Sequence, residues 1–296
     1  MKKIAYLVLS ALVFSLVSCH SRGAAAAPSA LPSGKETSEI IRQETPIKTS
    51  EEEKKDAPIQ KDSKSSADDK SAPVWNTSDT DVSHVDIHRK LIAFTFDDAP
   101  DSTIKSLLQA FASFNKDNPD CPASATFFCN GIYIDSSNFS MLEAAYGAGF
   151  ELGNHTDSHK NLTKLPSESI KKEIEAVDKI LQKIDGKEKH LVRVPYGCFN
   201  DRVLKQADAP LIDWQIDTED WKGISADKIF TAVYKDRCPG AIVLMHDGYK
   251  HTVEAVKLLL PALKKDGYQV VNVSQLSKAL DCPFFAGKIY THVKQQ

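Results

Sequence analysis

From about residue 90 onward, short apolar stretches alternate with longer segments in which apolar residues recur every three or four positions. The stretch LIAFTF at 91–96 is typical of a buried strand, and the segment 167–186 predicts an amphipathic helix with its apolar residues on one face. Further strands are predicted within 124–131, 150–154, 190–197, 211–217, 240–247 and 268–273, and further helices within 101–115, 141–147, 225–235 and 253–267. Repeated strand-then-helix units predict an α/β fold with a parallel sheet, either a barrel or a doubly wound sheet.

The beginning of the chain lacks this periodicity. Two lysines precede an apolar run from Ile4 to Val17, which is too short to span a bilayer comfortably and has the layout of a secretory signal. The run ends in LVSC at 16–19, which resembles the lipobox of bacterial lipoproteins. This resemblance implies a signal peptide over 1–18 and a lipid anchor on Cys19 that holds the exported chain to the periplasmic or cell-surface face of a bacterial membrane. An ordinary signal peptide that contains a cysteine by chance is the alternative.

Residues 19–87 are dominated by Ser, Lys, Glu, Asp, Ala and Pro, without sustained apolar periodicity. Such a segment buries too little apolar surface to offset its chain entropy, so we expect a disordered tether that lifts a folded domain at 88–296 off the membrane. The chain has 296 residues and a formal net charge of -3. This charge argues against nucleic acid as a partner, because binding a phosphate backbone calls for a clustered basic surface.

The six cysteines contain no C-x-x-C spacing, which argues against a zinc ribbon or a redox pair. With Cys19 assigned to lipidation, five remain, and an odd number leaves at least one unpaired even in an oxidising compartment. Their pairing stays open. The five are Cys121, Cys129, Cys198, Cys238 and Cys282.

Two adjacent aspartates, Asp97 and Asp98, stand at the end of the strand predicted at 91–96. Like charges this close repel unless a cation or a proton relieves them, so the pair is either an exposed turn or a functional site. Adjacent residues of an extended strand point to opposite sides, so the two carboxylates need not share one role. Functional residues of β/α barrels collect at the carboxyl ends of strands, and other reactive residues should therefore follow other strands.

Such residues do follow other predicted strands. His155 and His159, in HTDSH, are four residues apart, a spacing that puts two imidazoles on one face of a helical turn and suits two ligands of one metal ion. A nearby carboxylate completes a familiar catalytic metal site. An arginine that suits a bidentate clamp on a carboxylate opens RVPYG at 193–197. Acidic and aromatic residues follow in DTEDW at 217–221, and a histidine ends LMH at 244–246.

In this order, TFDD (95–98), HTDSH (155–159), RVPYG, DTEDW and LMH resemble the five motifs of the NodB-type polysaccharide deacetylases, carbohydrate esterase family 4. The resemblance covers about residues 90–280. The chain departs from the family pattern at Ala99, where Gly is usual, and at Val194, where Pro is frequent. Neither position supplies a side chain to the chemistry, so neither departure puts activity in doubt.

The resemblance implies a distorted (β/α) barrel of the NodB-homology type with fewer than eight complete units, and one bound divalent metal ion, most often zinc, with cobalt or nickel possible. The implied metal ligands are Asp98, His155 and His159. The implied catalytic residues are Asp97 as general base, Arg193 as its partner, His246 as general acid, Asp217 as the residue that favours the imidazolium form of His246, and Tyr196, whose backbone N–H stabilises the oxyanion. The implied walls around the acetyl group are Trp221 and Leu244, together with Tyr196, and ordinary core packing is the alternative for the first two.

We therefore expect a metal-dependent hydrolase that removes N-acetyl groups from GlcNAc units of a polysaccharide, such as cell-wall peptidoglycan or chito-oligosaccharide. An O-acetyl xylan esterase with the same site is the alternative enzyme. A catalytically inactive carbohydrate-binding lipoprotein, or an adhesin, is the alternative outside enzymes, and an inactive protein would be marked by loss of a ligand, the base or the acid. We expect a monomer whose partners are the polysaccharide and, through the lipid anchor, the membrane.

Overall fold

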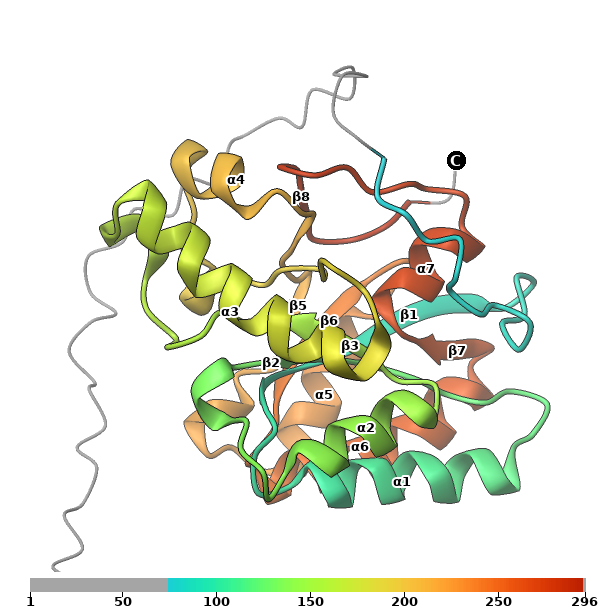
Figure 1. Ribbon diagram of the computed structural model, residues 1–296. Coiled ribbons are helices and arrows are strands. Elements are labelled where there is room, and N and C mark those ends of the chain that lie inside the picture. The colour runs from blue at the N-terminus through green and yellow to red at the C-terminus, as the bar shows by residue number, and fades with distance from the viewer. Residues whose placement is uncertain (1–73, 295–296) are drawn as a thin grey trace, which may run out of the picture. The chain divides into compact units, whose positions relative to one another are not determined.

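The computed structural model describes residues 74–294, whose backbone forms an α/β fold around a six-stranded parallel sheet (Figure 1). The strand order is β3-β2-β1-β6-β5, and β7 pairs with the first half of β1. The strands are β1 (Lys90–Ala99), β2 (Thr126–Cys129), β3 (Glu151–Asn154), β5 (Ile216–Asp217), β6 (Ile242–His246) and β7 (Tyr268–Val271). The α/β fold with a parallel sheet is confirmed. The predicted signal peptide, Cys19 and the tether as far as residue 73 lie outside the described residues.

The sheet continues past β3 into an incomplete barrel. Isolated parallel bridges join Asn154 to Val192, and Val192 to the start of β4 (Leu211–Ile212), which pairs with β8 (Ile289–Tyr290). The chain then passes from β4 to β5 through residues 213–215. Because the segment around Val192 makes single bridges where a further strand was predicted, the wall has fewer than eight regular strand–helix units, in keeping with the barrel that the motifs implied.

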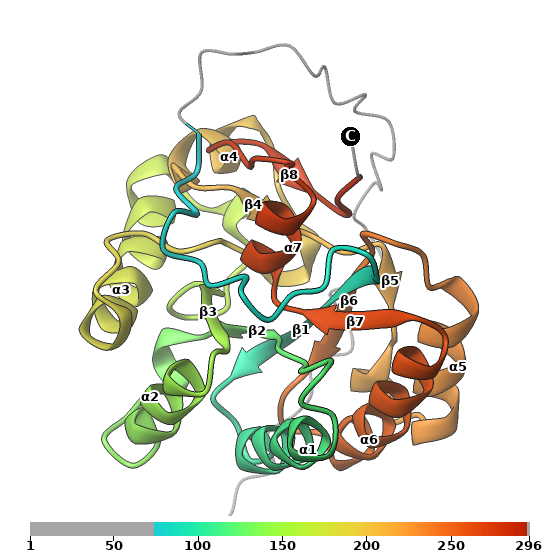
Figure 2. The ribbon, with the colours of Figure 1, turned by 90° about the vertical axis from the view of Figure 1, so that its right-hand side faces the viewer.

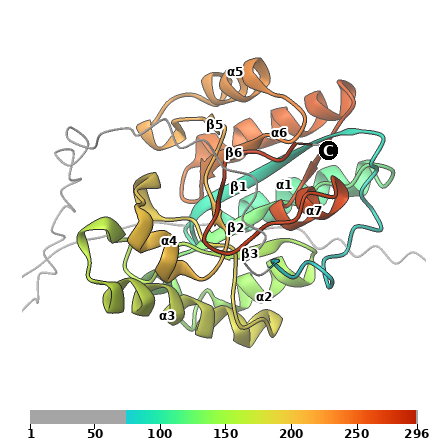
Figure 3. The same cartoon turned by 90° about the horizontal axis from the view of Figure 1, so that it is seen from above.

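Seven α-helices of the described part surround this wall. They are α1 (Ile104–Asp117), α2 (Phe139–Gly147), α3 (Ser167–Asp185), α4 (Asp201–Ala207), α5 (Ala226–Asp236), α6 (Lys250–Lys265) and α7 (Val273–Ala279). Figure 2 shows α1 and α6 beneath β1, and the view from above in Figure 3 shows α2 and α3 on one side of the sheet and α5 and α6 on the other. The helix predicted at 167–186 is α3. No helix among the described residues has both the length and the apolar character needed to cross a membrane.

Successive side chains of β1 point alternately to the two faces of the sheet, toward the helices and toward the barrel interior. Phe94 and Phe96 are fully buried in the main apolar cluster between the sheet and the helices. Thr95 and Asp97, which alternate with them, face the other way, and both accept hydrogen bonds from Arg193. One face of the strand therefore anchors the core while the other carries polar groups into the barrel.

The segment before β1 packs onto the domain, so the boundary predicted after residue 87 is wrong. The backbone N–H of Trp75 donates to the carbonyl of Phe284 at 2.7 Å. Val85 packs against a buried apolar cluster, and Gln269 hydrogen-bonds the backbone on both sides of Val85 at 2.8 Å. The polar composition of the segment gave no sign of the contacts made by Trp75 and Val85. Residues 74–87 belong to the folded domain.

Candidate metal centre and active site

Three side chains meet beyond the carboxyl end of β1 and form a candidate metal site. Asp98 Oδ1 lies 3.8 Å from His155 Nε2 and 3.6 Å from His159 Nε2, and the candidate ligand atoms all lie within 4.8 Å of one another. Asp98 Oδ1 is buried and has no hydrogen-bond partner, a deficit that a bound cation would relieve. Two imidazoles and one carboxylate are a ligand set that zinc accepts. The three predicted ligands therefore come together and fit one divalent ion.

The loop that carries the two histidines is not the helical turn that their spacing suggested. It follows β3, and Thr156 and His159 have positive φ angles of 67° and 51°. His155 Nδ1 lies 2.7 Å from the carbonyl oxygen of Arg193, and because a carbonyl only accepts, Nδ1 carries the proton and leaves Nε2 to face Asp98. Burial, and then the neighbouring His155, lowers the pKa of His159, which favours the neutral imidazole that binds metal.

Helix α3 holds this loop from outside through residues that the sequence analysis missed. Glu173 accepts hydrogen bonds from the backbone N–H and the hydroxyl of Ser158, and the N–H of Asp157 donates to the carbonyl of Glu173 at 2.9 Å. Asp178 accepts a hydrogen bond from Asn154 Nδ2 at 2.8 Å. Both ends of the ligand loop are thus attached to one helix. These residues could have been found from the sequence, because Glu173 and Asp178 are two carboxylates on the otherwise apolar, buried face of an amphipathic helix.

Asp97 lies beside the cluster and is held by Arg193. Arg193 Nη1 donates to Asp97 Oδ1 at 2.8 Å and to Thr95 Oγ1 at 2.7 Å, while the other two guanidinium nitrogens donate to backbone carbonyls. Only one nitrogen reaches the carboxylate, so the contact is not the bidentate clamp that was expected. Burial acts to raise the pKa of Asp97, but the charges of Arg193, His155 and His246 outweigh burial and lower it. Asp97 is therefore a buried, ionised carboxylate.

The two adjacent aspartates face the same histidine, contrary to the alternation expected of a strand. The pairing register of β1 shifts at this point, and Asp98 has a positive φ of 63°. Asp97 Oδ2 and Asp98 Oδ1 lie 3.6 Å and 3.8 Å from His155 Nε2. Their partners nevertheless differ, because Asp97 is paired with Arg193 whereas the buried oxygen of Asp98 has no hydrogen-bond partner.

The carboxylate that orients His246 belongs to Asp220, and the role predicted for Asp217 is wrong. His246 Nδ1 lies 2.7 Å from Asp220 Oδ1, and the backbone N–H of His246 donates to Asp220 Oδ2 at 2.8 Å. Thr252 Oγ1 donates to the same oxygen at 2.6 Å, and Asp220 is fully buried. Asp217 is exposed and accepts a hydrogen bond from the backbone N–H of Glu219. Both aspartates stand in DTEDW, and only Asp220 turns toward His246.

The Asp220–His246 pair predicts how activity depends on pH. Burial acts to lower the pKa of His246, but the hydrogen bond and the charge of Asp220 outweigh burial, and the pKa of His246 is raised. A general acid works while protonated, so activity should persist below this pKa and fall as pH rises through it. In Asp220→Asn the pKa of His246 falls, and the alkaline limb of the kcat/KM profile should move to lower pH by about one unit or more.

The matched control for this variant is Asp217→Asn, which removes an exposed carboxylate from the same motif. Its alkaline limb should coincide with that of the unmodified protein. A limb that moves in Asp217→Asn and stays in place in Asp220→Asn would restore the assignment made from the sequence and contradict the geometry.

The remaining predicted residues lie around these groups. Tyr196 has a positive φ of 63°, and its ring centroid lies 4.8 Å from that of His159. Leu244 is buried on β6, and Trp221 is half-buried in the turn Asp220–Lys222. The structure thus brings all three near the metal ligands or the acid, while their contacts with an acetyl group, and the role of the Tyr196 N–H, stay predictions.

The cysteines of the described part of the chain are not among the candidate ligands of this site. All five in the described part of the chain are free thiols, and two of them, Cys121 and Cys129, are buried. Burial raises the pKa of both buried thiols, which keeps them protonated. They act as small core side chains.

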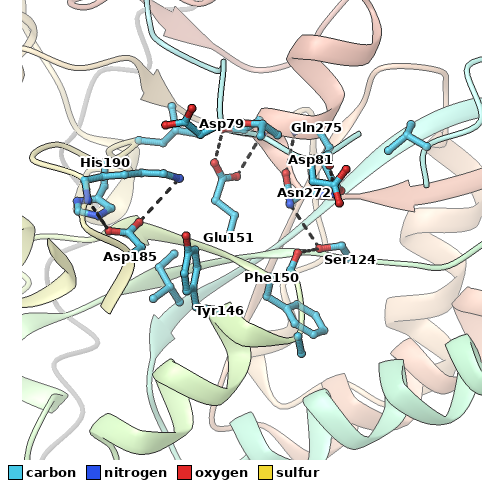
Figure 4. Close-up of a pocket in the computed structure, with 18 of the residues that line it drawn as sticks. Asp79, Asp81, Ser124, Tyr146, Phe150, Glu151, Asp185, His190, Asn272 and Gln275 are labelled. Atoms are coloured by element: carbon cyan, nitrogen blue, oxygen red, sulfur yellow. Dashed lines mark hydrogen bonds and ion pairs between the residues drawn. The ribbon is translucent and has the colours of Figure 1, made fainter. Parts of the chain in front are cut away.

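Figure 4 shows a cavity of about 900 Å³. Its lining includes the start of β3, so it lies at the opposite end of that strand from the loop that carries the metal ligands. It opens between the segment before β1, the start of β3 and the start of α7, and no predicted site residue lines it. Two of its acids have partners: Glu151 accepts hydrogen bonds from Ser274 and Thr126, and one carboxylate oxygen of Asp185, Oδ1, pairs with His190. The reactive groups of the described chain therefore gather at the carboxyl ends of the strands and not in this cavity.

The family model described as polysaccharide deacetylase matches residues 84–210. A peptidoglycan-N-acetylmuramic acid deacetylase, PdaC, of Bacillus subtilis (strain 168) is 34% identical over 198 residues, which are 66% of this chain and 40% of that protein. A peptidoglycan-N-acetylglucosamine deacetylase of Bacillus cereus (strain ATCC 14579) is 34% identical over 201 residues, which are 64% of this chain and 89% of that protein. The chain thus spans less than half the length of the first relative and most of the second.

A solved structure shares the fold. The family 4 acetyl xylan esterase from Clostridium thermocellum, determined in complex with a cobalt ion, superposes with a TM-score of 0.64 at 26% identity. The superposition covers 69% of this chain and 99% of that one.

Proposed function

The chain belongs to the polysaccharide deacetylase family, and from this membership we propose that it is a metal-dependent hydrolase that removes N-acetyl groups from GlcNAc units of a polysaccharide. The observation that carries the proposal is the grouping of one candidate metal site with the buried carboxylate of Asp97 and with the Asp220–His246 pair, whose histidine lies opposite Asp97 on the neighbouring strand. Peptidoglycan is the substrate that we favour, because both curated relatives are named as peptidoglycan deacetylases.

The metal ion would be held by Asp98, His155 and His159. We propose zinc, with cobalt or nickel as alternatives, and such an ion supplies Lewis-acid activation of water and of the acetyl carbonyl. The fit rests on the buried, unpartnered oxygen of Asp98 and on the neutral form that the lowered pKa of His159 favours.

The side chains of this protein would carry the protons. Asp97 accepts the proton of the attacking water, and Arg193 keeps the carboxylate ionised and fixed in place. His246, protonated and oriented by Asp220, donates a proton to the leaving nitrogen, so that the amide splits into acetate and a free amine. The Tyr196 backbone N–H would stabilise the oxyanion.

Two apolar side chains would bound the acetyl group. Leu244 lies on β6 two residues before His246, and Trp221 directly follows Asp220. These positions place both side chains close to the proposed acid, where an apolar wall would receive the methyl group of the substrate.

We also propose that the protein works as an exported monomer, tethered to a bacterial membrane through lipid on Cys19. The support is the sequence of the first residues, in which an apolar run ends in LVSC before a long polar segment. Such a tether would bring the domain within reach of cell-wall glycan.

An acetate-release assay tests the proposal. We expect acetate from peptidoglycan and from chito-oligosaccharides, loss of release when a chelator removes the metal, and recovery when zinc is added back. Acetylated xylan is the comparison substrate. If no acetate is released from peptidoglycan, chito-oligosaccharides or acetylated xylan while metal is present, the proposed enzymatic activity is contradicted and a carbohydrate-binding protein is favoured.

The O-acetyl xylan esterase is the second candidate, because the fold and about a quarter of the residues are shared with the acetyl xylan esterase described above. Acetate released from acetylated xylan but not from peptidoglycan or chito-oligosaccharides would favour it. An inactive protein would be expected to have lost a metal ligand, the base or the acid. In this chain the three proposed ligands, the buried carboxylate proposed as base and the paired histidine are all present.

A further inference from the structure

A buried histidine that has no role in the reaction proposed above lies between α3 and the barrel wall. His190 is only 2% exposed, and each of its ring nitrogens faces a carboxylate of α3. Nδ1 lies 2.9 Å from Asp178 Oδ1, and Nε2 lies 3.2 Å from Asp185 Oδ1 (Figure 4). Because an ionised carboxylate only accepts hydrogen bonds, a histidine between two of them carries a proton on each nitrogen. His190 is therefore an imidazolium.

The charges around His190 favour this form. Burial acts to lower the pKa of His190, but the hydrogen bonds and charges of Asp178 and Asp185 outweigh burial, and the pKa is raised. Burial acts to raise the pKa of Asp185, but the hydrogen bond and charge of His190 outweigh burial and lower it. A further cation, Lys187 Nζ, lies 3.8 Å from Asp185 Oδ2. The imidazolium therefore persists to a higher pH than that of an ordinary histidine.

Asp178 also contacts the strand that leads to the metal ligands. The oxygen that faces His190 accepts a hydrogen bond from Asn154 Nδ2 at 2.8 Å. Asn154 is fully buried, ends β3 and directly precedes the proposed ligand His155. Its Oδ1 accepts the N–H of Thr156 at 2.9 Å, on the other side of that ligand. The side chain of Asn154 therefore fixes the backbone that carries His155.

Backbone contacts connect the same histidine with the same ligand by a second route. The N–H of Asn154 donates to the carbonyl of Leu191, next to His190, at 2.8 Å, and the N–H of Arg193 donates to the carbonyl of Asn154 at 2.9 Å. His155 Nδ1 donates to the carbonyl of Arg193 at 2.7 Å. The short segment that begins at His190 thus ends in the carbonyl that orients the ligand.

We propose that His190 is a positioning residue of the metal centre. By joining two carboxylates of α3 through its two N–H groups, it fixes the segment 190–193 and Asn154 to that helix, and through them it fixes the direction of His155. The inference rests on the proposed metal site. Groups that orient a metal ligand contribute to the affinity for the metal, so loss of His190 should weaken metal binding in a protein that still folds.

The test is the zinc affinity of His190→Gln, measured by competition with a chelating indicator. The amide of glutamine has no charge and cannot donate to both carboxylates in the geometry of the ring, so the affinity should fall about tenfold. Asp178→Asn should lose about as much. In the double variant the loss should stay about tenfold and not reach about 100-fold, because the two residues act in series on the same ligand.

Two spectroscopic measurements separate positioning from general stability. The visible absorption of the cobalt-loaded protein depends on the geometry of the ligands, and its bands should change in His190→Gln. Nitrogen NMR of the imidazole should show both ring nitrogens of His190 protonated at neutral pH. A neutral ring there would overturn the proposal.

The matched control is Gln269→Leu, which removes another buried polar side chain. Gln269 lies on β7, is also 2% exposed, and donates to the carbonyls of His84 and Pro122 at 2.8 Å. Its loss should lower the free energy of unfolding. The zinc affinity and the cobalt spectrum should match those of the unmodified protein.

An unchanged zinc affinity and an unchanged cobalt spectrum in His190→Gln would overturn the positioning role. Additive losses in the double variant, or an equal loss in Gln269→Leu, would also overturn it, because general destabilisation predicts both. If the unmodified protein binds no zinc, the proposed metal site fails and this role fails with it, a result distinct from normal affinity in the variants. Should His190→Gln not fold, Asp185→Asn decides: a loss of affinity supports the role, and an unchanged affinity overturns it.

Discussion

An Asp97→Asn variant is expected to lose acetate release by about 10²–10⁴-fold, the range that a general base contributes, while it still binds one divalent ion. The amide has nearly the shape of the carboxylate but does not take up the proton of the attacking water. Its oxygen still accepts from Arg193, which also donates to Thr95 and to two backbone carbonyls, so the guanidinium keeps its place. Steady-state kinetics and metal analysis of the same preparation measure both halves of this result.

The control is Asp217→Asn, which makes the same chemical change at an exposed position. It should retain activity close to that of the unmodified protein. Full activity in Asp97→Asn would show that another group accepts the proton. Loss of the metal together with activity would place Asp97 among the ligands.

A His155→Ala variant is expected to lose the metal and the activity together. His155 is buried and offers Nε2 to the candidate site, while its Nδ1 is occupied by the carbonyl of Arg193. Removing one of the three proposed protein ligands leaves two. The affinity for zinc should then fall by more than the 10- to 100-fold that loss of a hydrogen-bond partner of a ligand costs. Competition titration with a chelating indicator measures the affinity, and acetate release measures the activity.

His88→Ala is the control, because His88 is an exposed histidine before β1, away from the ligand loop. It should bind metal and release acetate as the unmodified protein does. Addition of excess zinc should not restore His155→Ala to full activity. A His155→Ala protein that works at low zinc concentration would remove this residue from the ligand set.

The positions of most strands along the chain, and the residues that follow them, could be predicted from the sequence, because both depend on local apolar periodicity and on the rule that parallel strands end at one edge of a sheet. Asp98, His155 and His159 meet for this reason. The backbone conformation of the turns between strand and helix could not be predicted in this way, because periodicity describes only regular elements. Glu219 has a positive φ of 56°, and the backbone there turns Asp220 inward and leaves Asp217 in solvent.

The same limit applies to the adjacent aspartates. Alternation along a strand predicted that Asp97 and Asp98 would point to opposite sides, and the register shift in β1 with the positive φ of Asp98 brought both toward His155. Periodicity describes regular structure, and this site is built where regular structure ends. The different partners of the two carboxylates, and not their directions, separate their roles.

The N-terminal boundary was misjudged for a different reason. Composition averages over many residues, and a mostly polar segment with two apolar anchors, Trp75 and Val85, has the average of a tether. Trp75 hydrogen-bonds Phe284, and Gln269 hydrogen-bonds the backbone on either side of Val85, so both partners lie far away in the sequence. Only the folded arrangement shows that residues 74–87 are part of the domain.

The central claim is that two adjacent aspartates serve one metal site in different ways, Asp98 as ligand and Asp97 as base. The most direct test is the zinc affinity of Asp97→Asn and Asp98→Asn, measured side by side by competition titration. We predict that Asp97→Asn binds one zinc ion per chain within about tenfold of the unmodified affinity, and that Asp98→Asn falls by about 100-fold or more. Equal affinities for the two variants, or a larger loss in Asp97→Asn, would contradict the assignment.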